Sequence, residues 1–305
     1  MTFKVNAETK TTTESTARQA RLEGILAEMG SVIVAYSGGV DSAYLAVVAH
    51  RTLGGRALAV TADSASLAAS QREQALDVAG RFGFAHRLIR TRELDDPLYV
   101  RNAPDRCYHC KSELFSQLLP LASDEGFAHV AYGLIVDDLS DFRPGHRAAQ
   151  EAGVRAPLAE AGLGKSDVRS LSRDLGLPTW DLPSSPCLAS RLPYGTAVTP
   201  EALGRVDRAE AGLRRLGFRE LRVRHLGNGA RVEIATDEMS RLEAPGVRQA
   251  AEAAVLAAGY GAVEIDPEGY RRGRLNEALG VRLVGTGQTV YDLARRAKDR
   301  VRPGG

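Results

Sequence analysis

A short loop near the start of the chain combines the residue types that bind a phosphate chain, Ser37-Gly38-Gly39-Val40-Asp41-Ser42. It follows an apolar, β-branched run at 31–36 that predicts a buried strand, and it precedes a predicted helix at 43–52. Backbone N–H groups and the helix dipole favour an anion at such a turn. The glycines admit phosphate closely, the two serines donate hydroxyls, and Asp41 suggests a Mg²⁺ contact. We therefore predict a pyrophosphate-binding loop.

Two other interpretations of this loop are less consistent with its sequence. A bare Gly-Gly would indicate an ordinary strand-to-helix turn, but the whole hexapeptide in this context favours function. A Walker A loop is excluded, because no G-x-x-x-x-G-K-[ST] occurs. The segment Gly164-Lys165-Ser166 lacks the leading glycine, since Ala159 occupies that position.

Three cysteines form the second set of candidate groups. Cys107 and Cys110 form a CxxC motif just before a predicted helix at 111–125, and Cys187 lies alone in a Ser- and Pro-rich segment. A CxxC motif serves as a redox pair, half a zinc site or two ligands of an iron–sulfur cluster, and its spacing does not choose among them. Three thiolates can hold three corners of a 4Fe-4S cube and leave one iron open. Cys187 is also compatible with a small buried apolar residue.

The elements that must position these groups alternate between strand and helix. Strands are predicted at 31–36, 57–62, 86–89 and 129–134, and helices at 17–29, 43–52, 66–81, 111–125 and 166–176. This order indicates the α/β class, with a parallel sheet, helices on both faces and ligands at the carboxyl ends of the strands. Asp63 follows the second strand and Asp137-Asp138 the fourth, so we expect these carboxylates to border the nucleotide.

A smaller α+β unit is predicted after Pro178. It comprises helices at 199–216 and 246–258, a hairpin of strands at 221–225 and 230–234, and a strand at 262–265. Arg222 and Arg224 alternate with apolar residues, so both lie on one face of a strand, suited to a substrate phosphate or carboxylate. The exposed face of an ordinary hairpin is the alternative interpretation.

Composition narrows the partners only slightly. The 40 basic and 38 acidic side chains leave a formal net charge of +2, so nothing global demands nucleic acid. Residues 1–16 lack the apolar run of a secretory signal, and no stretch approaches the roughly 20 apolar residues of a membrane span. We expect a cytoplasmic protein without a membrane partner.

The loop at Ser37–Ser42 resembles the PP-loop of ATP pyrophosphatases. The resemblance implies cleavage of Mg²⁺–ATP between its α- and β-phosphates, transfer of AMP to a substrate oxygen, and displacement of AMP by a nucleophile. The segment 165–178 is similar to a later segment of that superfamily, which implies that Lys165 reaches the polyphosphate. A solvated residue at a helix start is the alternative for Lys165.

A second resemblance is narrower. The segment 187–195, with Glu210, the Arg222-x-Arg224 strand, Glu233 and 141–145, is similar to the LarE family of sulfur transferases. It implies conversion of the carboxylates of pyridinium-3,5-biscarboxylic acid mononucleotide to thiocarboxylates, for the nickel-pincer nucleotide of lactate racemase. It assigns Ser190 and Arg191 to the substrate phosphate, and Glu210 and Glu233 to metal or substrate. It also implies a homo-oligomer, a hexamer.

The source of sulfur differs among family members. Some sacrifice a single cysteine in the Cys187 region, whereas others carry three cysteines that are thought to bind a 4Fe-4S cluster with an extra sulfide. The pattern of Cys107, Cys110 and Cys187 resembles the second group, so we favour the cluster; the physiological sulfide donor stays open.

The rival functions are a tRNA thiolase, favoured only by the Arg-rich segment 295–302, and a non-catalytic nucleotide sensor. The domains expected are a disordered N-terminus at 1–16, a PP-loop domain at 17–183, an α+β substrate and sulfur-transfer domain at 184–276, and an extension at 277–305.

Overall fold

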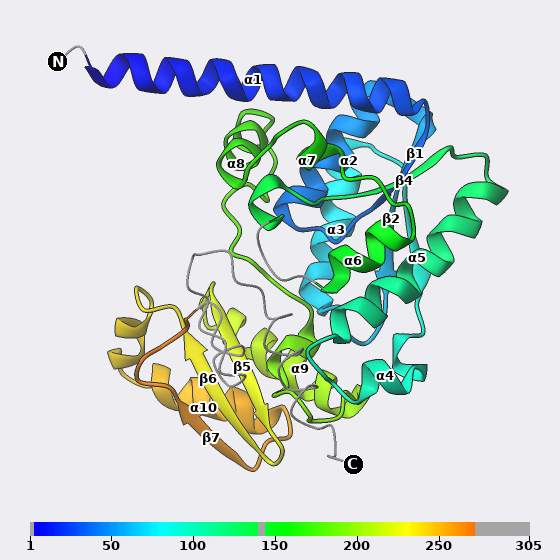
Figure 1. Ribbon diagram of the computed structural model, residues 1–305. Coiled ribbons are helices and arrows are strands. Elements are labelled where there is room, and N and C mark those ends of the chain that lie inside the picture. The colour runs from blue at the N-terminus through cyan, green and yellow to red at the C-terminus, as the bar shows by residue number, and fades with distance from the viewer. Residues whose placement is uncertain (1–2, 140–143, 272–305) are drawn as a thin grey trace, which may run out of the picture.

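The computed structural model describes residues 3–139 and 144–271, and their side chains from Glu14 onward. The first part of the chain alternates strands and helices (Figure 1). In chain order the elements are α1 (Phe3–Met29), β1 (Val32–Ala35), α2 (Val40–Leu53), β2 (Ala57–Asp63), α3 (Ala69–Phe82), β3 (His86–Arg90), α4 (Pro97–Val100), α5 (Arg106–Asp124), β4 (His129–Tyr132), α6 (Pro144–Glu151), α7 (Pro157–Glu160) and α8 (Lys165–Asp174).

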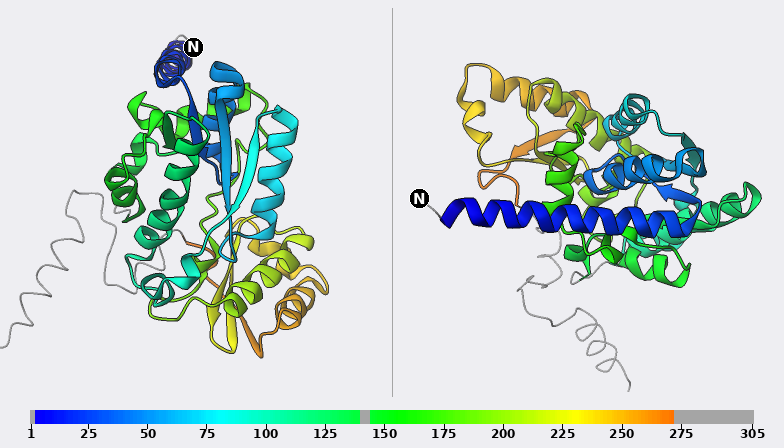
Figure 2. Two further views of the ribbon diagram at one scale, coloured as in Figure 1. Left: turned by 90° about the vertical axis from the view of Figure 1, so that its right-hand side faces the viewer. Right: turned by 90° about the horizontal axis from the view of Figure 1, so that it is seen from above.

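The described strands of this part form one four-stranded sheet of order β3-β2-β1-β4, in which every pair is parallel. Successive side chains of β1 point to opposite faces. Val32 and Val34 pack in a core with α1, α2, α3 and α8, whereas Ile33 and Ala35 pack with α5 and α6. Figure 2 shows these helices on the two sides of the sheet. The predicted parallel α/β sheet is therefore confirmed.

A second sheet of order β5-β6-β7 follows, with β5 and β6 antiparallel and β6 and β7 parallel. Its elements are α9 (Pro200–Arg215), β5 (Leu221–Leu226), β6 (Gly229–Ile234), α10 (Val247–Ala257) and β7 (Ala262–Ile265). The predicted hairpin, helices and last strand are all present. In the sequence, the strands of the first sheet precede residue 184 and those of the second sheet follow it. The division into two domains at this point stays a prediction.

The start of the chain differs from the expectation. We expected residues 1–16 to be disordered, but α1 begins at Phe3 and projects past the sheet (Figure 1). Tertiary contacts reach into this segment: the Ser15 hydroxyl donates to Asp167 at 2.5 Å and Arg18 pairs with the same carboxylate at 2.7 Å. Such contacts stabilise a helix more than local propensity does. The predicted extension at 277–305 lies outside the described residues.

No described helix is both long and apolar enough to cross a membrane.

Short elements connect the two sheets. The irregular segment after α8 is held by Arg169, which donates to the carbonyl oxygens of Trp180 at 3.0 Å and Leu182 at 2.8 Å. The next segment carries Cys187 and enters a turn of 3-10 helix, η4 (Leu188–Arg191). An apolar cluster joins this turn and α9 to α4 of the first part.

Candidate active site

The PP-loop lies at the carboxyl end of β1, where α2 begins. Gly38 has a positive φ of 74°, and a Cβ there would lie 3.1 Å from the Cβ of Ala75, so glycine is needed. Gly39 caps α2 without a side-chain hydrogen bond. The Ser42 hydroxyl accepts from the Ser37 N–H at 3.1 Å and lies 3.0 Å from the Ser37 hydroxyl. The first-turn N–H groups of α2 are thus left for an anion.

The opposite wall of this loop comes from the start of α8. The Lys165 Nζ pairs with both carboxylate oxygens of Asp41, at 2.8 and 2.9 Å. The Lys165 backbone N–H donates to Asp137 at 2.8 Å. The structure therefore brings together Lys165, Asp41 and Asp137, which are distant in sequence. Asp63 lies at the end of β2 but pairs with Arg72 at 3.2 Å.

A cleft of about 820 Å³ opens from this cluster toward the second sheet. Asp41, Asp137 and Lys165 line one side, and Arg219, Glu220 and Tyr270 line another. Ser184, at the start of the cysteine segment, also contributes to the lining. The cleft is large enough for a small nucleotide and lies between Asp41 of the phosphate loop and Ser184, three residues before Cys187.

We expected the CxxC motif to precede the helix. It lies instead at the start of the helix, because α5 begins at Arg106. Arg106 donates to the carbonyl oxygen of Ala189 at 3.0 Å and to the Asn102 side chain, whose amide donates to Pro193 at 2.8 Å. These bonds fasten the turn that carries Cys107 to the turn that follows Cys187.

The three thiols gather in one region. Cys110 and Cys187 pack against the same apolar cluster, and Arg106, the neighbour of Cys107, donates to Ala189 two residues after Cys187. Burial, followed by Cys187, raises the pKa of the Cys110 thiol. The protein atoms crowded around the Cys107 sulfur likewise raise its pKa, although part of the residue is exposed.

The donor types of an iron–sulfur site are therefore present, but they are not arranged as a metal site. Within the described residues no three His, Cys, Asp or Glu side chains are placed to hold a metal ion. His109, in the same helix, lies 3.4 Å from Asp96 and 3.6 Å from Asp105.

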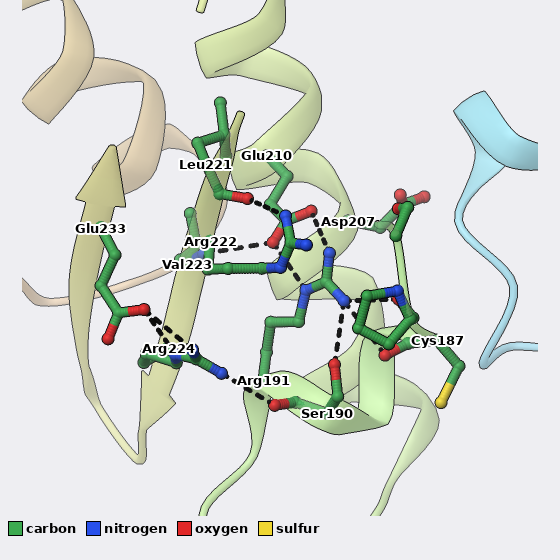
Figure 3. A network of polar contacts seen from close by, with 12 residues as sticks. Cys187, Ser190, Arg191, Asp207, Glu210, Leu221, Arg222, Val223, Arg224 and Glu233 are labelled. Carbon is green, nitrogen blue, oxygen red and sulfur yellow. Dashed lines mark hydrogen bonds and ion pairs between the residues drawn. The ribbon is translucent and has the colours of Figure 1, made fainter. Parts of the chain in front are cut away.

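Arg191 is a buried organiser of the cysteine segment. Its guanidinium pairs with Glu210 through two bonds of 2.8 and 3.0 Å. It also donates to the carbonyl oxygens of Pro186 at 2.5 Å and Cys187 at 3.2 Å, and to the Ser190 hydroxyl at 2.9 Å. Figure 3 shows these contacts converging on Arg191 while the Cys187 sulfur points away from them. The nitrogens Nε, Nη1 and Nη2 of the guanidinium all donate to protein acceptors, and a direct bond to substrate phosphate stays a prediction.

The paired arginines of β5 face the same segment. Arg222 donates to the carbonyl oxygen of Ser184 and its guanidinium lies 4.7 Å from the Tyr270 ring centroid. Arg224 donates to the carbonyl oxygen of Ser190 at 3.0 Å and pairs with Glu233 at 2.8 Å (Figure 3). The predicted shared face is therefore confirmed, but it is not the exposed face of a hairpin, since Arg222 is 3% exposed.

Glu210 and Glu233 are the counter-charges of the buried arginines: Glu210 pairs with Arg191 and Arg214, and Glu233 pairs with Arg224. Burial alone would raise the pKa of Glu210, but Arg191, Arg214 and Arg222 outweigh it and hold the pKa below its usual value. Neither glutamate lies in a metal-binding group among the residues that the structure describes. A metal or substrate contact for either one stays a prediction.

Sequence reasoning missed three residues that build the site. Arg106 and Asn102 fasten the two cysteine segments together, and Gly133 lets the start of α2 approach β4. A Cβ on Gly133 would lie 2.9 Å from the Ser42 backbone nitrogen. A glycine after a strand was visible in the sequence, but the two polar residues gave no local signal, because their partners are about 90 residues away.

A parallel sheet whose first strand leads into this loop, with a lysine and aspartates at its mouth, defines an ATP-using enzyme. An uncharacterized protein of Synechocystis sp. is 44% identical over 268 residues, which cover 86% of this chain and 98% of the relative. The pyridinium-3,5-bisthiocarboxylic acid mononucleotide synthase of Lactiplantibacillus plantarum is 35% identical over 263 residues, 86% of this chain and 95% of that protein. The tRNA-specific 2-thiouridylase of Azorhizobium caulinodans is 33% identical over 193 residues, about half of each chain. No protein-family model matches.

The chain belongs to the LarE family of ATP-dependent sulfur transferases, within the PP-loop superfamily. ATP with Mg²⁺ is the cofactor that its relatives imply.

Proposed function

We propose that the protein converts the carboxylates of pyridinium-3,5-biscarboxylic acid mononucleotide to thiocarboxylates, for the nickel-pincer nucleotide used by lactate racemase. The observation that carries the proposal is the single cleft lined by Asp41 and Lys165 of the ATP site and by Ser184 of the cysteine segment. It lets an adenylate formed at one wall meet sulfur delivered from the other. The name of the Lactiplantibacillus relative supplies the substrate.

The reaction has two steps for each carboxylate. A carboxylate oxygen of the substrate attacks the α-phosphorus of ATP, and pyrophosphate leaves. Hydrosulfide then attacks the carbonyl carbon of the acyl adenylate, AMP leaves with the C–O bond electrons, and a proton is released. The products are the thiocarboxylate, AMP and pyrophosphate, and two rounds convert both carboxylates.

The residues around the loop bind and orient ATP in this proposal. The N–H groups at the start of α2 and the hydroxyls of Ser37 and Ser42 hold the leaving pyrophosphate. Lys165 stabilises the charge that develops on it, and Asp41, released from Lys165 by the incoming phosphates, binds Mg²⁺. Asp137 fixes the start of α8 through its bond to the Lys165 N–H. Tyr270 lines the cleft, and buried Arg222, stacked on its ring, places positive charge behind this wall.

We further propose that Cys107, Cys110 and Cys187 ligate a 4Fe-4S cluster. When bound, such a cluster would supply the sulfur that displaces AMP. Because the three thiols are gathered but not yet arranged as ligands, loading requires deprotonation and a change of side-chain rotamers. The alternative is transfer of the Cys187 sulfur itself. Reduced thiols in either route fit a cytoplasmic location.

The substrate is tested by mixing protein, Mg²⁺–ATP and the biscarboxylate nucleotide and measuring pyrophosphate. We expect release that depends on the nucleotide, and roughly 10²-fold slower release with Lys165→Met. Arg173→Met is the matched control, since Arg173 lies on the same helix and is 60% exposed. Pyrophosphate release that requires tRNA instead would establish the thiolase alternative and overturn this proposal.

The sulfur route is tested by anaerobic reconstitution with iron and sulfide. We expect bound iron and broad visible absorption, both lost in the Ala variants at Cys107, Cys110 and Cys187. A colourless protein that loses the mass of one sulfur at Cys187 per turnover would establish the sacrificial route instead.

A further inference from the structure

Asp167 is a buried carboxylate, two residues after Lys165, to which the proposed chemistry gives no task. It lies in the first turn of α8, and its side chain is 6% exposed. A buried carboxylate is costly unless donors surround it. Burial alone would raise the pKa of Asp167, but its hydrogen bonds outweigh burial and hold the pKa below its usual value. The carboxylate is therefore ionised at neutral pH, and its donors determine where it can lie.

The donors to Asp167 come from two different elements. The Gly164 N–H donates to its Oδ2 at 3.0 Å, which is the local capping bond of α8. The Ser15 hydroxyl donates to Oδ1 at 2.5 Å, and the Arg18 Nη1 donates to Oδ2 at 2.7 Å. These two residues belong to α1 and precede Asp167 by 152 and 149 residues. The local bond alone would cap the helix, so the bonds from α1 tie the start of α8 to a distant helix.

The same turn of α8 is also held at the mouth of the PP-loop. The Lys165 N–H donates to Asp137 at 2.8 Å. Gly164 permits this approach, since a Cβ there would lie 2.9 Å from the Asp137 carboxylate. The Lys165 Nζ lies 2.8 Å from Asp41 of the PP-loop. The backbone that carries the Lys165 side chain is therefore held by Asp137 on one side and, through Asp167, by α1 on the other.

Apolar packing also joins α1 to α8 (Figure 1), but it does not set the position of Lys165 by itself. Leu22 and Leu26 of α1 belong to the same core cluster as Val168 and Leu171 of α8. Such contacts are non-directional, so they hold the two helices together more than they set the rotation of either one. Hydrogen bonds are directional. The rotation matters for a side chain that acts on a reacting group, because a misplacement of about 1 Å can cost about 10²-fold in rate.

We propose that Ser15 and Arg18 are positioning residues of the ATP site: through Asp167 they hold the first turn of α8, and so keep Lys165 in place for the phosphates of ATP. The inference rests on the role proposed above for Lys165. None of the described residues of α1 lines the cleft, so the effect of α1 on ATP is indirect.

The inference is tested by a double-mutant cycle on the full chain, with the affinity for Mg²⁺–ATP measured by calorimetry. We expect Arg18→Met to weaken binding about fivefold and Lys165→Met to weaken it about tenfold. Because Arg18 acts through Lys165, the double variant should bind about as weakly as Lys165→Met alone. Independent effects would multiply to about fiftyfold, and this outcome would overturn the inference. Wild-type affinity in either single variant would overturn it too.

Two further variants separate this role from a general effect of charge. Arg21→Met removes an exposed positive charge from the same helix and should leave the affinity unchanged. Arg18→Lys keeps the charge, and because the arginine reaches Asp167 through one nitrogen, the affinity should stay within about twofold of the wild type. A loss in Arg21→Met or in Arg18→Lys as large as that in Arg18→Met would show that the ion pair with Asp167 is not responsible.

The fold and the proposed function are checked separately. Thermal unfolding followed by circular dichroism shows whether each variant is folded. If Arg18→Met does not fold, Ser15→Ala takes its place in the same cycle, since it removes the other bond from α1. Calorimetry requires ATP and no second substrate. Absent pyrophosphate release by the wild type with the biscarboxylate nucleotide therefore overturns the proposed function alone, whereas a multiplicative cycle overturns this inference alone.

Discussion

Glu210 is the buried counter-charge for the arginines around the Cys187 segment. One carboxylate without any exposed surface accepts from Arg191, from Arg214 at 2.8 Å and from the Val223 N–H at 3.1 Å. Two of these donors belong to segments on either side of it in sequence, the cysteine turn and β5. The carboxylate therefore decides where Arg191, and with it the Cys187 segment, can lie.

Glu210→Gln should be strongly destabilising. The amide keeps the shape but removes the counter-charge of buried Arg191, and breaking one partner of a buried pair costs about 3–5 kcal/mol. We expect this loss in the free energy of unfolding from urea denaturation at pH 7. Glu201→Gln, on the exposed first turn of the same helix, should change it by less than about 1 kcal/mol. Equal effects of the two changes would contradict this account.

The deficit of Glu210→Gln should also depend on pH. The folded-state pKa of Glu210 is held below the unfolded one, so the ionised carboxylate stabilises the fold above the unfolded pKa of about 4.3. That contribution is lost as the pH falls through the folded pKa. The difference in unfolding free energy between wild type and variant should therefore be constant from pH 6 to 8 and shrink below about pH 4. A constant difference down to pH 3 would show that the carboxylate charge is not responsible.

The sequence was informative about the residues of the site where a local motif exists. Ser37 to Ser42 and Lys165 lie where predicted, because a strand end and a helix start fix their positions. The role of Arg191 was less predictable: resemblance assigned it to substrate, and all three of its guanidinium nitrogens donate instead to Glu210, Ser190 and nearby carbonyl oxygens. Such pairing depends on residues brought together only by folding.

At the scale of elements, the PP-loop depends on how closely α2 approaches β4. Gly133 follows β4, and its missing Cβ leaves room for the first turn of α2. A Cβ there would lie 2.9 Å from the Ser42 nitrogen and 3.1 Å from the Asp41 carbonyl carbon. Both contacts are to backbone, so the helix start itself would have to move.

Gly133→Ala should therefore weaken ATP binding without removing any group that touches ATP. We expect about tenfold weaker binding of Mg²⁺–ATP by calorimetry, with a loss of about 1–3 kcal/mol in stability from the overpacking. Gly80→Ala, on the exposed face of α3 with open space around it, should leave the affinity unchanged. Wild-type affinity in Gly133→Ala would show that the turn can relax.

The elements themselves were largely predictable. The β-branched and alternating runs predicted each described strand of both sheets, since tertiary contacts and local pattern agree there. The boundaries of α1 and α5 were missed. The N-terminal part of α1 is polar and Thr-rich, and α5 begins at Arg106, directly before the CxxC motif, so neither start has an apolar helical repeat. Both starts are held by tertiary contacts, of Ser15 and of Arg106, which the sequence pattern does not reveal.

At the scale of the whole molecule, one apolar cluster connects the two sheets. Ala68 and Tyr99 come from the first part, whereas Leu188, Val198 and Leu203 come from the segment after Cys187 and from α9. Cys110 and Cys187 pack against this cluster, so the two parts cannot separate there without exposing apolar side chains. We infer that the ATP site and the cysteine segment are held as one cooperative unit.

Leu203→Ala tests this coupling, because Leu203 is fully buried in this cluster and belongs to none of the core clusters of the two sheets. Truncation should cost about 2–5 kcal/mol. The only tryptophan, Trp180, lies in the segment between the two parts and reports on it by fluorescence, while circular dichroism reports on all helices. We expect both thermal transitions to coincide and to fall together by several degrees, with Leu256→Ala, 45% exposed on α10, close to wild type. If the fluorescence transition stays in place while the circular dichroism transition splits, the two parts unfold independently and the cluster does not couple them.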